Sequence, residues 1–170
     1  PLISNEQRQK VLSFVENAKR EGAQLLYGGK IPDAPELKRG FFFEPTIFCE
    51  VLPKMQIFKE EVFGPVVCLG KFSHLEEAIE LANAVDYALA GCIWGRDEAK
   101  IKEIARRINA GIIWVNTYGM FFNELPYGGF KQSGFGKELG REGFLEYTRL
   151  KNVIFNSLNQ KPPVYYWYGF

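Results

Sequence analysis

The sequence predicts an α/β fold, in which a mainly parallel sheet is flanked by helices. Short apolar segments alternate with longer segments whose apolar residues recur at helical spacing, a pattern typical of βαβ units. The chain has 170 residues, 46% of them hydrophobic, so it can bury a core of its own. A strand near the carboxyl end and an aromatic tail complete the predicted architecture.

The first helix is expected from Ser4 to about Glu21. Ser4 and Gln7 fit a capping box at its start, and Gly22 fits its end. One face is apolar at helical spacing and the other is charged, so the helix should cover a sheet. The residues of this apolar stripe are Val11, Phe14, Val15 and Ala18.

The later elements are expected in alternating order. Pro45 would place the second strand at an edge or bend, and Ser73 with Glu76 fits a second capping box. A surface loop is expected at residues 30–39, and a brief turn or strand at 56–60. Strands are expected at residues 24–27, 41–48, 66–72, 90–94 and 111–115, and helices at 75–84 and 98–109.

The carboxyl end is predicted to contain an edge strand at residues 147–158, followed by an aromatic tail at 159–170. An edge strand near a terminus can pair with another chain. The tail carries four aromatic residues in a row, which favours packing on a neighbour over full solvation.

Composition and charge exclude several classes of function. The net charge is +1, with 21 basic and 20 acidic residues interspersed, so we expect neither nucleic-acid nor membrane binding. His74 is the only histidine, and no Cys/His spacing indicates a metal site. Cys49, Cys68 and Cys92 lie in apolar runs and are expected to be reduced intracellular thiols in the core. A cytoplasmic location is expected because the sequence carries no contrary signal.

The most informative segment is a glycine-rich loop that follows the strand at 111–115. Its glycines indicate positive φ angles or close backbone contacts, so the loop should line a site or an interface. Its spacing fits neither a P-loop nor GxGxxG, so phosphate binding is not expected. Lys131, Lys137 and Arg141 are expected to form ion pairs with Glu138 and Glu142, within and between subunits. The glycines are Gly128, Gly129, Gly134, Gly136 and Gly140.

Two motifs carry a resemblance to a known family. Residues 126–140, PYGGFKQSGFGKELG, resemble a segment near the carboxyl end of the NAD(P)-dependent aldehyde dehydrogenases. Residues 60–65, EEVFGP, resemble that family's cofactor-side motif. The resemblance runs from Pro1 to about Leu158 and corresponds to the carboxyl-terminal part of a family member, although Lys137 stands where Arg is commoner.

The resemblance implies an enzyme that oxidises an aldehyde to a carboxylic acid with NAD or NADP through a cysteine thioester. Residues 1–146 would form the carboxyl-terminal part of its catalytic domain, and 147–158 an oligomerisation strand of a homodimer or homotetramer. The catalytic cysteine, the general-base glutamate and the nucleotide-binding domain are expected before Pro1. This chain would then contain no catalytic residue, and alone it is expected to be inactive.

The predicted cofactor residues begin with Glu61 and Phe63. Pro65 favours an extended segment, in which residues two apart share a face. A carboxylate there could accept both hydroxyl protons of a ribose, and the ring could pack against nicotinamide. The resemblance adds Gln7 and Lys10 near the adenosine-side ribose, although capping and solvation explain them equally well.

The predicted substrate residues surround the aromatic bend after the strand at 111–115. The resemblance places Phe121, Tyr127, Tyr118 and Met120 along the aldehyde tunnel, with core packing as the alternative. Core packing is preferred for Phe122 and Phe130. The sequence leaves open which aldehyde is oxidised, and it also leaves open a non-catalytic binding or assembly module with the same fold.

Overall fold

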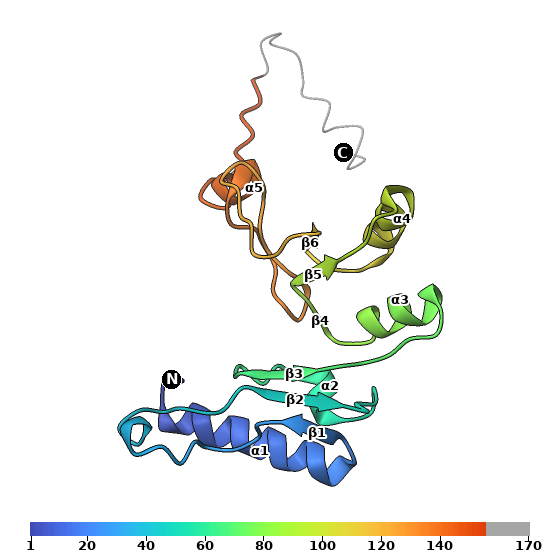
Figure 1. The fold of residues 1–170 in the computed structure, drawn as a ribbon. Coiled ribbons are helices and arrows are strands. Elements are labelled where there is room, and N and C mark those ends of the chain that lie inside the picture. The colour runs from blue at the N-terminus through green and yellow to red at the C-terminus, as the bar shows by residue number, and fades with distance from the viewer. Residues whose placement is uncertain (156–170) are drawn as a thin grey trace, which may run out of the picture.

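The structure, a computed structural model, describes residues 1–155. Figure 1 shows two groups of elements that follow one another along the chain. The first group contains α1 (Asn5–Glu21), β1 (Gln24–Tyr27), a 3-10 turn (Pro35–Leu37), β2 (Thr46–Cys49), α2 (Gln56–Lys59) and β3 (Val66–Cys68). The second contains α3 (Leu75–Asn83), β4 (Tyr87–Ala88), β5 (Ala90–Ile93), α4 (Glu98–Arg107), β6 (Ile112–Val115), β7 (Phe130–Lys131) and α5 (Gly140–Leu145).

The strands form three small sheets. In the first sheet, β2 lies in the middle, antiparallel to β1 and parallel to β3. In the second group, β5 pairs in parallel with β6, and β4 pairs antiparallel with β7. The α/β class is confirmed, and its parallel pairs lie in two separate sheets rather than in one continuous sheet.

Helix α1 covers the first sheet and supplies much of the core (Figure 1). The predicted apolar stripe is confirmed, because all of its residues are buried. Gly22 ends the helix with a φ of 98°, as its C-cap position favours. The core around α1 consists of Val11, Val15, Ala18, Ala23, Phe43, Phe48, Met55 and Ile57.

The helix starts differ from the predicted capping boxes. The Ser4 Oγ accepts a hydrogen bond from the Gln7 N–H at 3.1 Å, whereas the Gln7 side chain points elsewhere. At α3 the cap is His74, whose Nδ1 accepts from the Glu77 N–H at 3.2 Å. The prediction of Ser73 with Glu76 was therefore wrong by one residue.

Three other local predictions can be compared with the structure. Residues 56–59 form the short helix α2, a single helical turn, which agrees with the turn expected at 56–60 and not with the strand. Pro45 does not mark an edge, because it precedes the central strand β2 and interrupts none of its backbone hydrogen bonds. The strand predicted at 147–158 stays a prediction, because residues 147–155 form no strand in this single chain and their expected partner is a second chain. Residues 156–158 and the tail at 159–170 lie outside the described residues.

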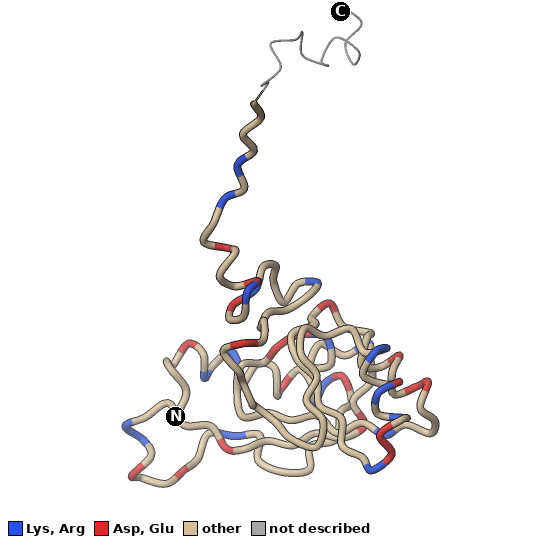
Figure 2. The backbone as a smooth tube through the Cα atoms, turned by 90° about the horizontal axis from the view of Figure 1, so that it is seen from above, with Lys and Arg blue, Asp and Glu red and all other residues tan. Residues whose placement is uncertain are grey.

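Basic and acidic residues are interspersed along the backbone of residues 1–155 (Figure 2). No helix in this range is long and apolar enough to cross a membrane. Beyond α5 the chain leads away from the body of the protein, and Leu150 and Ile154 are 101% and 92% exposed (Figure 2).

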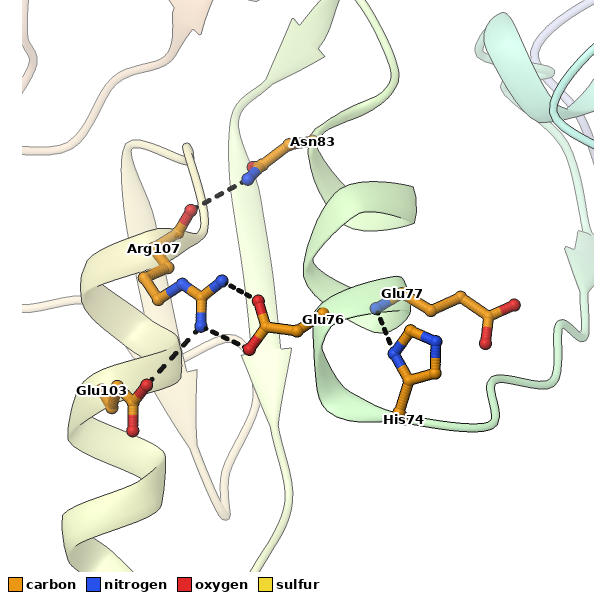
Figure 3. Close-up of polar contacts among 6 residues, drawn as sticks. All are labelled: His74, Glu76, Glu77, Asn83, Glu103 and Arg107. Carbon is orange, nitrogen blue, oxygen red and sulfur yellow. Dashed lines mark hydrogen bonds and ion pairs between the residues drawn. The ribbon is translucent and has the colours of Figure 1, made fainter.

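A polar network joins α3 to α4 (Figure 3). The Arg107 Nη1 donates to the Glu76 Oε1 at 2.9 Å, its Nη2 bonds the second carboxylate oxygen, and Glu103 lies 3.5 Å from Nη1. Asn83 accepts from the Asn109 N–H at 2.7 Å and donates to the Arg107 carbonyl oxygen at 2.9 Å. Arg107 thus ties the two helices that flank β5 and β6.

The Arg107–Glu76 pair should make stability depend on pH. The hydrogen bond from Arg107 holds the pKa of the Glu76 carboxyl below its usual value. A carboxyl with a lowered folded-state pKa stabilises the fold above its unfolded value, about 4.3, and loses this effect as the pH falls through the folded value.

We therefore expect Glu76→Gln to lower the thermal unfolding temperature slightly at pH 7, with the difference from wild type shrinking as the pH falls below about 4.3. Glu80→Gln is the matched control, because Glu80 is exposed on the same helix and forms no ion pair within residues 1–155. An equal effect of both substitutions at pH 7 would contradict the role of this pair.

Candidate functional site

The segment that joins α2 to β3 contains the predicted cofactor residues Glu61 and Phe63. Glu61 is exposed, Val62 packs against the core, and Phe63 is 73% exposed. Both side chains are therefore open to solvent, and their predicted sharing of one face stays a prediction. The segment is not a regular extended strand, however, because Phe63 has a φ of 52°, in the left-handed region.

Helix α1 fixes the backbone of this segment through hydrogen bonds and close packing. The Gln7 Nε2 donates to the carbonyl oxygens of Val62, at 3.1 Å, and Phe63, at 2.9 Å. One turn further, Val11 contacts Gly64 so closely that a Cβ at Gly64 would lie 2.5 Å from a methyl carbon. The first turns of α1 and the Glu61–Phe63 segment therefore form one unit.

Two neighbouring charged residues face other directions. Glu60 accepts a hydrogen bond from the Gln56 side chain at 3.2 Å. Lys10 is exposed, and its Nζ lies 5.9 Å from the centroid of the Phe14 ring. Within residues 1–155, the Lys10 side chain forms no hydrogen bond or ion pair with the Glu61–Phe63 segment, and its predicted cofactor role stays a prediction.

The predicted substrate residues gather around Trp114, at the end of β6. The ring centroids of Tyr118 and Phe121 lie 5.2 and 5.6 Å from that of Trp114, and Tyr127 lies 4.9 Å from Phe121. We call these four side chains the aromatic cluster. Met120 joins it through its carbonyl oxygen, which accepts from the Trp114 Nε1 at 2.8 Å.

Sequence reasoning missed Trp114, which is only 8% exposed and therefore anchors the cluster. Tyr118 and Phe121 remain 75% and 52% exposed, so they can contact a bound molecule. The position of Trp114 in the sequence could have indicated its role, because it lies on the strand that leads into the aromatic bend. Phe122 and Phe130 were predicted in the core, but they are 51% and 43% exposed, so that prediction was wrong for this chain.

The glycine-rich loop packs backbone against backbone beside the aromatic cluster. Tyr127 and Glu138 exchange two N–H to carbonyl hydrogen bonds, both 2.7 Å long. A Cβ at Gly111 would lie 1.8 Å from the Gly128 carbonyl oxygen, so only glycine fits there. Gly134, Gly136 and Gly140 have positive φ angles, as the sequence predicted. The loop lines a cleft that includes Leu89, Tyr127 and Glu146.

The lysines of this loop bond carbonyl oxygens rather than carboxylates. The Lys137 Nζ donates to the Gly128 and Gly129 carbonyls, at 3.0 and 3.2 Å, and lies 4.6 Å from the Phe130 ring centroid. Lys131 donates to the Asn83 and Val85 carbonyls at the end of α3. Within the described part of this chain neither lysine pairs with Glu138 or Glu142, and the pairs expected between subunits stay a prediction.

Comparison with known proteins identifies the family. A profile described as the aldehyde dehydrogenase family matches residues 1–153. The chain belongs to the aldehyde dehydrogenase family. It is 49% identical over 169 residues to a betaine aldehyde dehydrogenase of Bacillus subtilis, covering 99% of this chain and 34% of that protein. It is 47% identical over 153 residues to aminoaldehyde dehydrogenase 2 of Pisum sativum, a peroxisomal protein, covering 90% and 30%.

Solved dehydrogenase structures share the fold. A betaine aldehyde dehydrogenase of Staphylococcus aureus, a double mutant in complex with NAD+, matches with a TM-score of 0.92 and 45% identity over 95% of this chain and 32% of that chain. An aldehyde dehydrogenase of Bacillus cereus matches with a TM-score of 0.84 and 40% identity, covering 89% and 30%. The chain spans about a third of the length of these dehydrogenases.

The cysteines of this chain lie outside the core, contrary to the prediction. Cys68 and Cys92 are exposed, and Cys49 is half-buried with its thiol donating to the Gln24 Oε1 at 3.3 Å. The core prediction was wrong because the strands that carry them have only one covered face. Although Cys68 is exposed as a residue, partial desolvation raises the pKa of its thiol, so less of it ionises to the reactive thiolate. Within residues 1–155, His, Cys, Asp and Glu form no group that could hold a metal ion.

The contact between Gly111 and the glycine-rich loop gives a testable prediction. We expect Gly111→Ala to lower the free energy of unfolding by about 2 kcal/mol or more, because the backbone around Gly128 must move to admit the methyl group. Urea unfolding measures this loss. Gly70→Ala is the control, since no atom lies within 4 Å of the Cβ it would add. A loss equal to that of the control would show that Gly111 is not in close contact.

Proposed function

We propose that this chain is the carboxyl-terminal part of the catalytic domain of an enzyme that oxidises an aldehyde to a carboxylic acid with NAD+ or NADP+. The observation that carries the proposal is the Glu61–Phe63 segment, which presents a carboxylate and an aromatic ring to solvent while α1 holds its backbone. Exposed functional groups on a rigidly held, strained backbone are typical of ligand sites. Family membership supports the same conclusion.

The residues of this segment suit the nicotinamide half of the cofactor. Glu61 can accept both hydroxyl protons of a ribose in charge-assisted hydrogen bonds, and the Phe63 ring can pack against the flat nicotinamide. When bound, the nicotinamide accepts the hydride that leaves the substrate. A Staphylococcus aureus relative was crystallised with NAD+, which makes NAD+ the first cofactor to test.

The aromatic cluster suits an aldehyde that also carries a positive charge. The matched relatives are named for betaine aldehyde and aminoaldehydes, which contain an ammonium or amino group. A cation over the face of an aromatic ring is attracted by about 0.5 to 2 kcal/mol. Tyr118, Phe121 and Tyr127 offer such faces beside the glycine-rich loop. We therefore propose an aminoaldehyde or a quaternary ammonium aldehyde as the substrate class.

The proposed chemistry uses a cysteine thioester, with the nucleophile and general base outside this chain. The raised pKa of the Cys68 thiol and the Cys49 hydrogen bond to Gln24 support a structural role for these two thiols. This chain's part is to hold the cofactor and line the aldehyde site.

We further propose that residues 147–158 pair with a second copy in a homodimer or homotetramer. The exposed apolar side chains of Val153, Ile154 and Phe155 support this pairing. The cytoplasmic location stays a prediction, because plant relatives are named as peroxisomal or chloroplastic.

The cofactor role can be tested in the complete enzyme with Glu61→Gln. We expect the dissociation constant for NAD+ to rise about tenfold, because an amide accepts hydroxyl protons more weakly than a carboxylate. Calorimetric titration measures it, with Glu60→Gln as the matched control because Glu60 bonds Gln56 instead. An unchanged dissociation constant for NAD+ in Glu61→Gln would show that Glu61 does not bind the cofactor. Absence of any NAD+-dependent turnover in the wild type would favour the non-catalytic module.

The substrate class can be tested with Phe121→Leu in the same enzyme. We expect kcat/KM for an aminoaldehyde to fall about tenfold, whereas kcat/KM for an uncharged aldehyde of similar length should change less than about threefold. Phe122→Leu is the control, because Phe122 is similarly exposed but lies outside the aromatic cluster. Equal losses with both aldehydes would show that the ring supplies bulk and not attraction for a cation.

A further inference from the structure

We infer that Gln7 is a positioning residue, whose side-chain amide fixes the backbone turn at Phe63 and thereby aims the Glu61–Phe63 segment at the cofactor. The inference rests on the proposed function and deepens it, because it names what sets the shape of the cofactor site. Gln7 lies in the first turn of α1, 55 residues before Val62 in the chain.

The turn at Phe63 requires an external restraint. A φ of 52° is uncommon for any residue with a Cβ, and more so for a bulky aromatic one. The Phe63 side chain is 73% exposed, so its own packing cannot hold the backbone there. A strained backbone persists only where its surroundings determine it.

The Gln7 amide supplies this restraint through its geometry. In extended chain, successive carbonyls point in opposite directions, whereas helical φ and ψ values of either hand turn them to the same side. The Gln7 Nε2 bonds the Val62 and Phe63 oxygens at 3.1 and 2.9 Å, and these carbonyls flank the Phe63 Cα. One amide group can reach both oxygens only while Phe63 stays turned.

Helix α1 is itself fixed at this end. The Ser4 Oγ caps the Gln7 N–H, and Val11, which is 0% exposed, contacts Gly64. Val62 packs on the same core. The Gln7 backbone is therefore held in place, and the apolar contacts of Val11 and Val62 flank its two side-chain hydrogen bonds.

Positioning by Gln7 differs measurably from direct cofactor binding by Gln7. A direct contact matters only when the cofactor is bound, whereas a positioning residue also shapes the free enzyme. The Val66 N–H donates to the Gly64 carbonyl at 2.8 Å, and the Thr46 N–H donates to the Pro65 carbonyl at 2.8 Å. Exchange of these two amide hydrogens in the absence of cofactor thus reports on the segment itself.

The test uses Gln7→Met in the complete enzyme, which removes both donors and keeps the length and helix propensity of the side chain. Gln9→Met is the matched control, because Gln9 is exposed on the same helix and its side chain forms no hydrogen bond within the described chain. Gln7→Glu is a second variant in case Gln7→Met fails to fold. Its carboxylate suits a helix N-terminus but cannot donate to carbonyls above pH 7.

We expect Gln7→Met and Gln7→Glu to accelerate exchange at Val66 and Thr46 without NAD+, and to raise the dissociation constant for NAD+ about tenfold, while Gln9→Met changes neither. Unchanged exchange in the free enzyme would overturn the inference, whether or not NAD+ binding weakens. If the wild type itself does not bind NAD+, the proposed function fails, and exchange alone still decides whether Gln7 holds the turn.

Discussion

The candidate cofactor site depends on the contacts by which helix α1 fixes the backbone of the Glu61–Phe63 segment. The Gln7 amide bonds two successive carbonyls, and Val11 contacts Gly64 at a distance that excludes any larger residue. Because the carboxylate and the ring project from this turn, their direction follows from the helix rather than from the segment's own sequence. The side chains that would meet the cofactor can then remain exposed while their backbone stays fixed.

A second constraint of the same kind shapes the candidate substrate site. The Gly111 and Gly128 backbones touch, Tyr127 and Glu138 are joined by two hydrogen bonds, and Lys137 binds the two carbonyls between them. These contacts place Tyr127 against Phe121, while Trp114 supports the cluster from β6. In both sites, backbone contacts made by glycines and long polar side chains position aromatic rings that remain open to a ligand.

The sequence predicted elements that depend on local pattern and missed features that depend on distant contacts. The stripe from Val11 to Ala18 and the stop at Gly22 predicted α1 correctly, because spacing and conformational preference act within a few residues. The turn at Phe63 was missed, since Gly64-Pro65 favours extended chain and the opposing contact comes from Gln7. Cys68 and Cys92 lie in apolar strands, but which strand face is covered depends on tertiary packing. Trp114 was missed because it also lies in an apolar strand, where only tertiary packing shows which ring supports the aromatic cluster.

The most direct measurement is a crystal structure of the complete enzyme with bound NAD+. We expect the Glu61 carboxylate about 2.7 Å from the hydroxyls of the nicotinamide ribose, the Phe63 ring against the nicotinamide, and both Gln7 hydrogen bonds intact. A cofactor whose nicotinamide ribose binds elsewhere, with Glu61 facing solvent or Phe63 relaxed to an extended backbone, would contradict the account.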